Sequence, residues 1–169
     1  MSAPQQLVVG ALLVLVLMLG CATGGRLGGG PEALRLSELA DEGDASRRAS
    51  LRLCADGLDA DVDGRRVAAL DQYERAIQID PMNPYAYLVL ARHDLEAGDP
   101  VRALEYLNQA EMLLESEDAL SPEVEAHLVG LRGAALRDMG GAGEGYLEQA
   151  RRLAPTVWDD GQLTAAELR

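Results

Sequence analysis

The chain has 169 residues, a formal net charge of −13 at pH 7, and neither lysine nor phenylalanine. This length suits one domain. Its acidity predicts repulsion from nucleic acid and from anionic lipid headgroups, so charge excludes both as electrostatic partners.

The chain begins with an apolar segment. Residues 7–20 carry no charge, and a run of this length is typical of a signal-peptide core, because a helix needs about 20 apolar residues to cross a bilayer. Residues 17–21 read Leu-Met-Leu-Gly-Cys, which resembles the lipobox of bacterial lipoproteins. The resemblance implies a signal peptide over residues 1–20 and a lipid, such as palmitate, on Cys21. The alternative is an ordinary signal peptide or an uncleaved membrane anchor.

A Gly-rich tether is predicted to follow over residues 21–30. Within the lipoprotein resemblance, Ala22 indicates an outer-membrane address, with the folded part facing the periplasm. With Cys21 lipidated, Cys54 is left as a free thiol without a partner for a disulfide. We expect it to be a small buried hydrophobe, and we expect the fold to depend on its apolar core.

Helices are predicted from residue 31 onward. Residues 31–42 form a short extra helix, and a helix over 46–60 pairs with one over 65–79. Between these two helices, Asp59, Asp61 and Asp63 precede a glycine, as in the first half of a calcium-binding loop. The position that should close such a loop is Leu70, so we expect a solvated acidic loop and keep a calcium or small-ligand site as the alternative function.

Small and apolar residues recur with a period of 34 positions: Ala69 with Ala103, Tyr73 with Leu107, and Ala76 with Ala110. The clearest unit has two helical faces with apolar residues at spacings of three and four, which are Tyr87, Leu90, Ala91 and Leu95, then Leu104, Leu107, Ala110 and Leu114. Gly98-Asp99-Pro100 predicts the turn between them. The unit resembles the tetratricopeptide repeat.

Further along the chain, an insertion over residues 116–121 precedes a predicted helix over 122–139 and another over 142–154. The predicted repeat domain covers residues 31–155, and a tail over 156–169 with the only tryptophan, Trp158, is predicted to cap the last repeat.

The resemblance implies an all-α, tetratricopeptide-like solenoid of about three helical hairpins. It also implies a groove that binds a protein or peptide, without enzymatic activity and without a cofactor. The residues that it places in this partner-binding groove are Leu51, Ala55, Tyr85, Val89 and Arg92. A lipid-anchored protein of this kind is expected to act as a scaffold or assembly factor for a pilus, a secretion pore or the wall machinery of the bacterial envelope.

Two polar residues are singled out by their positions. Asp94 stands where the repeat usually has an aromatic residue, with Arg92 and Arg102 as possible partners. We expect the helix to rotate slightly so that Asp94 reaches solvent. His93 is expected on the flank of its helix, and no second histidine or cysteine lies near it at the spacing of a zinc site.

Overall fold

The computed structural model describes residues 34–169, and no strand occurs among them. The helices in chain order are η1 (Leu36–Leu39), α2 (Ala45–Val62), α3 (Arg66–Ile79), α4 (Pro84–Ala97), α5 (Pro100–Ser116), α6 (Pro122–Asp138), α7 (Glu144–Leu153) and α8 (Ala165–Leu168). The predicted signal peptide, Cys21 and the tether lie outside the described residues.

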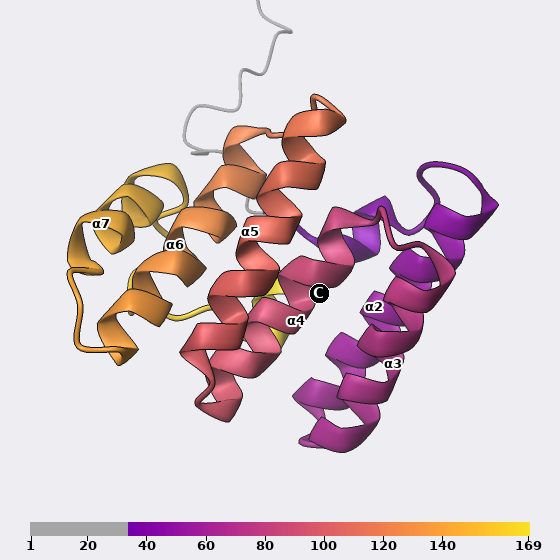
Figure 1. The fold of residues 1–169 in the computed structure, drawn as a ribbon, viewed down its shortest axis with the longest axis horizontal. Helices are drawn as coiled ribbons and strands as arrows, with labels where there is room; N and C mark the ends of the chain where they lie inside the picture. Colours follow the sequence, from indigo (N-terminus) through magenta and orange to yellow (C-terminus); the bar gives the residue numbers. More distant parts are fainter. Residues whose placement is uncertain (1–33) are drawn as a thin grey trace, which may run out of the picture.

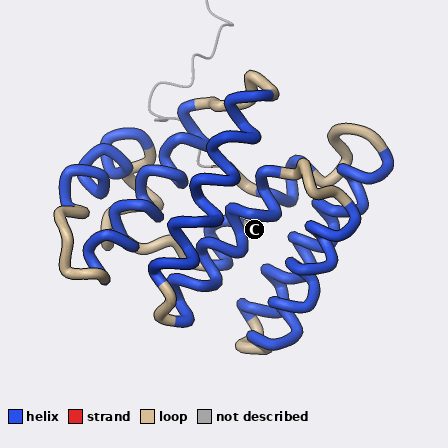
Figure 2. The backbone as a smooth tube through the Cα atoms, in the orientation of Figure 1, coloured by secondary structure: helices blue, strands red, loops and turns tan. Residues whose placement is uncertain are grey.

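Three helical hairpins build the fold, as predicted. They are α2 with α3, α4 with α5 and α6 with α7, and Figure 1 shows them in one row from the indigo to the orange end of the chain. Short loops join the two helices of each hairpin (Figure 2). The architecture is an all-α solenoid, in which each hairpin packs against its neighbours in the chain.

The ends of α4 show why the hairpins begin and end where they do. The Asn83 side chain caps the helix by accepting a hydrogen bond from the backbone N–H of Tyr85, and Pro84 occupies the first turn. Gly98 ends α4 with φ of 82°, a conformation that costs residues with a Cβ free energy. The Asp99 side chain then caps α5. The turn predicted at these residues is therefore confirmed.

Small residues set the distance between the helices of a hairpin. Ala103 and Ala110 on α5 are fully buried, as are Ala69 and Ala76 at the equivalent places on α3. Cys54 is also fully buried, which confirms its predicted role as a core residue, and burial raises the pKa of its thiol. Side chains of this size let two helix backbones approach closely.

Replacing Ala103 by leucine should therefore overpack the contact between α4 and α5. We expect the free energy of unfolding to fall by about 2 kcal/mol, because a well-packed core has no room for three more carbon atoms. Ala97→Leu is the matched control, since Ala97 is exposed on α4, and its expected effect is below about 0.5 kcal/mol. Chemical denaturation of both variants measures the difference, and equal stabilities would contradict the packing described above.

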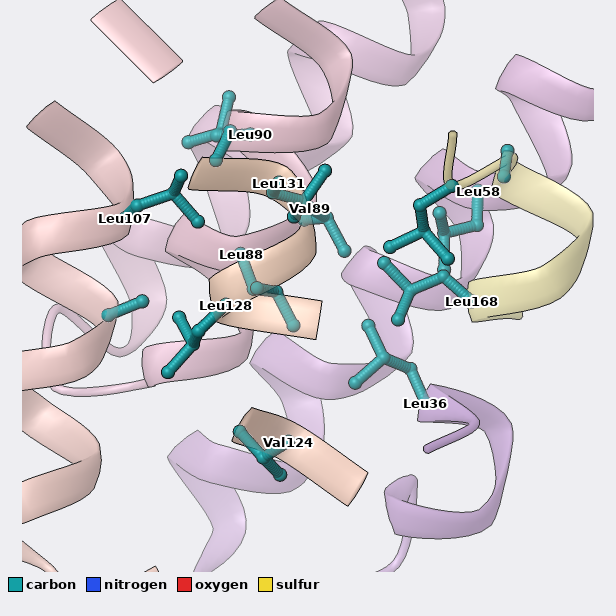
Figure 3. Close-up of a cluster of buried hydrophobic side chains, with 14 of the residues drawn as sticks. Leu36, Leu58, Leu88, Val89, Leu90, Leu107, Val124, Leu128, Leu131 and Leu168 are labelled. Carbon is teal, nitrogen blue, oxygen red and sulfur yellow. The ribbon is translucent and has the colours of Figure 1, made fainter. Parts of the chain in front are cut away.

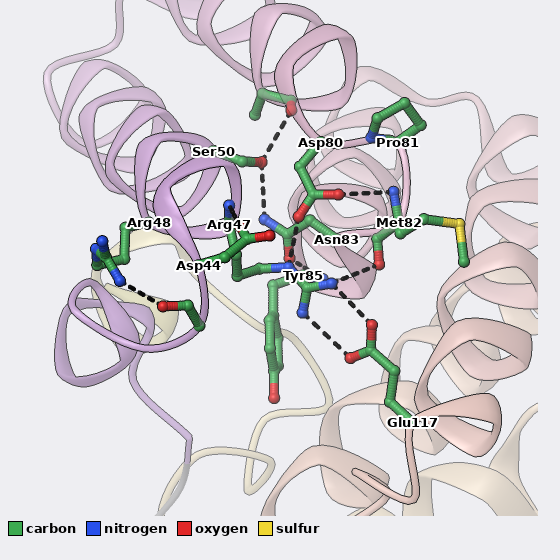
Figure 4. A network of polar contacts seen from close by, with 12 residues as sticks. Asp44, Arg47, Arg48, Ser50, Asp80, Pro81, Met82, Asn83, Tyr85 and Glu117 are labelled. Atoms are coloured by element: carbon green, nitrogen blue, oxygen red, sulfur yellow. Dashed lines mark hydrogen bonds and ion pairs between the residues drawn. The ribbon is translucent and has the colours of Figure 1, made fainter.

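A polar network joins the first hairpin to the second (Figure 4). Arg47 on α2 donates to Asp80 at the end of α3 over 2.6 Å and to Glu117 at the end of α5 over 2.8 Å. Nearby, the Asn83 amide donates to the buried hydroxyl of Ser50 over 2.8 Å. These bonds connect residues that are 33 and 70 positions apart, so they fix the angle between neighbouring hairpins.

The last repeat is closed by Trp158, which is fully buried against α6. A Cβ atom on Gly130 would lie 2.3 Å from the indole ring, so only glycine fits there without a shift. His127, on the same helix, has its ring centroid 6.3 Å from that of Trp158. The tail therefore packs on the last hairpin at Trp158, and its later residues continue onto another surface.

Replacing Gly130 by alanine should push the indole of Trp158 away from α6. We expect a loss of about 2 kcal/mol in the free energy of unfolding and a red shift in the fluorescence of this single tryptophan. Gly145→Ala, on α7, is the control, because nothing lies within 4 Å of the added Cβ. Unchanged fluorescence in the Gly130 variant would show that the ring does not pack as described.

Candidate interaction surface

The first helices of the three hairpins lie side by side, because α4 contacts both α2 and α6. We refer to the surface formed by α2, α4 and α6 as the inner face. Two short helices lie against it: η1 and α8 both pack on α2, and the residues before α8 approach α4 and α6. Leu168 of α8 lies between Leu58 of α2 and Leu36 of η1 in the apolar cluster of Figure 3.

The five residues predicted to line an open groove are on the inner-face helices α2 and α4, but the structure does not leave them open. Leu51 and Val89 are fully buried, Arg92 is 3% exposed, and Ala55 and Tyr85 are half-buried. η1 and α8 lie on this face, which no pattern in the sequence predicted.

Arg92 belongs to a buried polar cluster. Its guanidinium donates to the carboxylate of Asp61 and, over 2.8 Å, to Glu96. Asp61 also accepts from the hydroxyl of Tyr73 over 3.0 Å and lies 3.1 Å from His93 Nδ1. The Asp61 and Arg92 side chains are 2% and 3% exposed, so Arg92 is the main compensation for the buried charge of Asp61.

The pKa of Asp61 reflects these contacts. Burial alone would raise it, but the hydrogen bond from His93, the positive charge of Arg92 and the Tyr73 hydroxyl together hold it below the ordinary value of an aspartate. A carboxyl group whose pKa is lowered by folding stabilises the fold above its pKa in the unfolded chain. That contribution is lost as the pH falls through the folded pKa.

The three aspartates of the predicted acidic loop do not converge on one point. Asp59 and Asp61 lie on α2 and Asp63 is its C-terminal cap. Their side chains pair with three different arginines, which are Arg169, Arg92 and Arg65 respectively. Within residues 34–169 no group of three or more His, Cys, Asp or Glu side chains could hold a metal ion. The geometry therefore gives the calcium-loop alternative no support.

Two further expectations were wrong. His93 is not a flank residue: it is buried, bonded to Asp61, and its ring meets Tyr73 edge-on with the centroids 5.7 Å apart. Asp94 does not reach solvent either. It is fully buried, and Arg102 of the next helix donates two hydrogen bonds to it, over 2.6 and 2.8 Å. A bidentate arginine offsets the cost of burying the carboxylate, so no rotation of the helix is needed.

One part of the inner face remains open as a cavity of about 500 Å³ between all three inner-face helices and the tail. Its walls are Asp61 and Val62 of α2, Arg92, Leu95 and Glu96 of α4, Leu131, Ala134, Arg137 and Asp138 of α6, and residues 162–166. Charged groups of both signs thus stand beside apolar side chains. This mixture suits a segment of protein chain, which presents backbone polar groups and side chains together.

No helix among the described residues is long and apolar enough to cross a membrane.

Comparison with known proteins agrees with this architecture. Residues 63–119 match the tetratricopeptide repeat family, and they cover α3, α4 and α5. No curated protein and no solved structure matches the chain. The match places a tetratricopeptide repeat within residues 63–119, and the all-α fold of three stacked hairpins is a tetratricopeptide-like solenoid.

Proposed function

We propose that this protein is a lipid-anchored scaffold that holds a protein partner on its inner face, in the periplasm of a bacterium with an outer membrane. Tetratricopeptide repeats generally mediate protein–protein interactions, which supports the scaffold role. The observation that carries the proposal is the cavity of about 500 Å³, because all three hairpins contribute to its walls. A segment bound there would contact the whole solenoid at once.

The chemistry of the cavity supports a peptide segment as the bound group. Leu95 and Leu131 offer apolar contact, while Glu96, Arg137 and Asp138 offer charged groups. Fixed polar groups of this kind select the orientation of a ligand, and the apolar surface contributes most of the favourable free energy of binding. We propose that the partner belongs to an envelope assembly such as a pilus, a secretion pore or the wall machinery.

Site-specific photo-crosslinking in cells tests where the partner binds. A photoreactive residue in place of Gln162, which is exposed and lines the cavity, should give a discrete crosslinked product. The same residue in place of Glu105, exposed on α5 away from the cavity, is the control and should not give that product. Equal products from both positions, or none from Gln162, would contradict binding at the inner face.

The lipid anchor is tested separately, through Cys21. The lipobox-like string around it supports cleavage before the cysteine and attachment of lipid to it. Cys21→Ser should leave the precursor uncleaved and unlabelled by a fatty-acid probe, whereas the natural chain takes up the label. Equal labelling of the two chains would remove the anchor from the proposal and leave the interaction surface unaffected.

A further inference from the structure

The C-terminal tail consists of two parts that are attached to the molecule differently. The first part ends at Trp158, whose ring is fully buried against Gly130. The second part, residues 163–169, follows Gly161, which has φ of 74°, and its helix α8 packs on α2. Asp159 and Asp160 between them are exposed. The buried ring of Trp158 anchors the first part of the tail to α6. The residues after it extend from this anchor to the inner face.

The contacts of residues 163–169 resemble those of a bound peptide. Leu168 is fully buried in the cluster with Leu36 and Leu58 (Figure 3). Arg169 pairs with Asp59 of α2, and its carbonyl oxygen accepts from the backbone N–H of Ser37 over 3.1 Å. A buried leucine thus supplies the apolar contact, and a terminal arginine supplies the charged one.

Few polar contacts join this second part to the rest of the molecule. Its helix, α8, has four residues, which is far below the length at which a helix is stable alone. The ion pair between Arg169 and Asp59 is 50% and 41% exposed, and pairs of this kind are weak and screened by salt. The attachment therefore depends mainly on the buried side chains of Leu163, Ala165 and Leu168 and on the tether through Trp158.

We infer that residues 163–169 are an internal ligand of the inner face, and that a partner reaches the part of α2 around Leu58 and Asp59 only by displacing them. The inference rests on the proposed function, since it describes how that same surface is regulated. It also names the class of partner: a short amphipathic segment in which a leucine for the slot between Leu36 and Leu58 is followed by a basic residue for Asp59.

Tethering explains why a weak contact is sufficient to close the site. A segment joined by a short flexible linker is present at an effective concentration on the order of millimolar. A free peptide with the same contacts must compete against that concentration in the intact chain. Its apparent Kd is therefore raised to about the millimolar range, and removal of the tethered segment should lower it at least tenfold.

A labelled peptide with the sequence of residues 159–169 tests the inference by fluorescence anisotropy. It should bind a chain that ends at Gly161 at least tenfold more tightly than it binds the intact chain. A control peptide with Leu168→Ala and Arg169→Glu should bind the shortened chain at least tenfold more weakly than the natural peptide does. Equal binding to the shortened and intact chains would overturn the inference, as would no binding to a shortened chain that keeps its helix content and melting temperature.

A second variant covers the case in which the shortened chain does not fold. The intact chain with Leu168→Ala and Arg169→Glu keeps every residue of the backbone, and its segment should leave the inner face more easily. The natural peptide should then bind it at least fivefold more tightly than it binds the unaltered chain, and equal affinity would overturn the inference.

The same variant separates this inference from the proposed function. Crosslinking from position 162 should increase when the segment is weakened, and an unchanged yield would overturn the internal ligand while leaving partner binding intact. If neither chain crosslinks a partner, the proposed function fails, and the peptide titration still decides whether residues 163–169 are a ligand of α2.

Discussion

Replacing Asp61 by alanine is expected to lower the free energy of unfolding by about 4 kcal/mol. The substitution leaves the guanidinium of Arg92, which is 3% exposed, without its main counter-charge, and removes the acceptor for Tyr73 and His93. Removing one member of a buried ion pair costs about 3–5 kcal/mol, because the other charge stays in a medium of low polarity. Chemical denaturation followed by circular dichroism measures the loss.

Asp63→Ala is the matched control for this prediction. Asp63 is two residues further along the same segment, but its side chain is 61% exposed and its partner Arg65 is 59% exposed. An exposed pair of this kind contributes little, so we expect a change below about 0.5 kcal/mol. Similar losses in the two variants would show that the buried Asp61–Arg92 pair stabilises the fold no more than the exposed Asp63–Arg65 pair does. A variant with Asp61→Asn should fall between them, because the amide keeps one hydrogen-bond acceptor.

Acidification from pH 7 to pH 4 should destabilise the fold by about 3 kcal/mol through His127 alone. This side chain is fully buried, and burial lowers its pKa to about 4, although a hydrogen bond to the Leu34 carbonyl opposes the shift. The neutral ring donates from Nε2 to that carbonyl over 3.3 Å and leaves Nδ1 without a partner. Protonation would therefore place an uncompensated charge in the core.

The sign of this effect follows from which state takes up the proton first. A histidine in the unfolded chain has a pKa of about 6.5, so between about pH 6.5 and 4 the unfolded chain binds the proton and the folded chain does not. Stability consequently falls as the pH falls through this window and levels off below it. One pKa unit corresponds to about 1.4 kcal/mol, which gives the expected total.

His127→Gln isolates this contribution, because glutamine keeps an N–H donor for the Leu34 carbonyl but does not titrate. The difference in unfolding free energy between the natural chain and the variant should change with pH only between about pH 6.5 and 4. The carboxylates contribute equally to both chains, so they cancel from the difference. A constant difference over this window would show that His127 is not buried in its neutral form.

The proposed scaffold has an interaction surface with two different parts. The cavity beside Arg137 is open, whereas the surface near Leu58 is covered by α8. A partner that fits only the cavity would bind without any rearrangement. A partner that also contacts Leu58 and Asp59 of α2 would have to displace the segment that ends at Arg169, so its affinity would depend on how firmly that segment is held.

Local patterns in the sequence were sufficient to predict the repeated part of the fold. The period of 34 positions placed Ala69 with Ala103 at equivalent places in two repeats, and both residues are buried there. The turn at Gly98 could also be predicted from the sequence, because the end of one helix, its glycine and the cap of the next helix are adjacent in the chain. Such features involve residues that are close in sequence, so their spacing carries the information.

The buried polar contacts could be predicted from the sequence only in part. Arg102 was recognised as a possible partner of Asp94, but pattern alone could not decide between an ion pair and exposure to solvent. The buried cluster around Asp61 was missed for the same reason. Its members come from α2, α3 and α4, and nothing in the spacing of Asp61 and His93, which are 32 positions apart, marks them as neighbours.

By itself, the sequence determined the three hairpins, their turns and their small-residue contacts, since these depend on helical periodicity and on residues within one repeat. The tertiary structure alone decided what lies on the inner face. Arg169 meets Asp59 from 110 positions away, and His127 meets Leu34 from 93 positions away. Contacts between residues so far apart in the sequence depend on which surfaces the stacked hairpins leave uncovered. Those surfaces form only when the hairpins have packed.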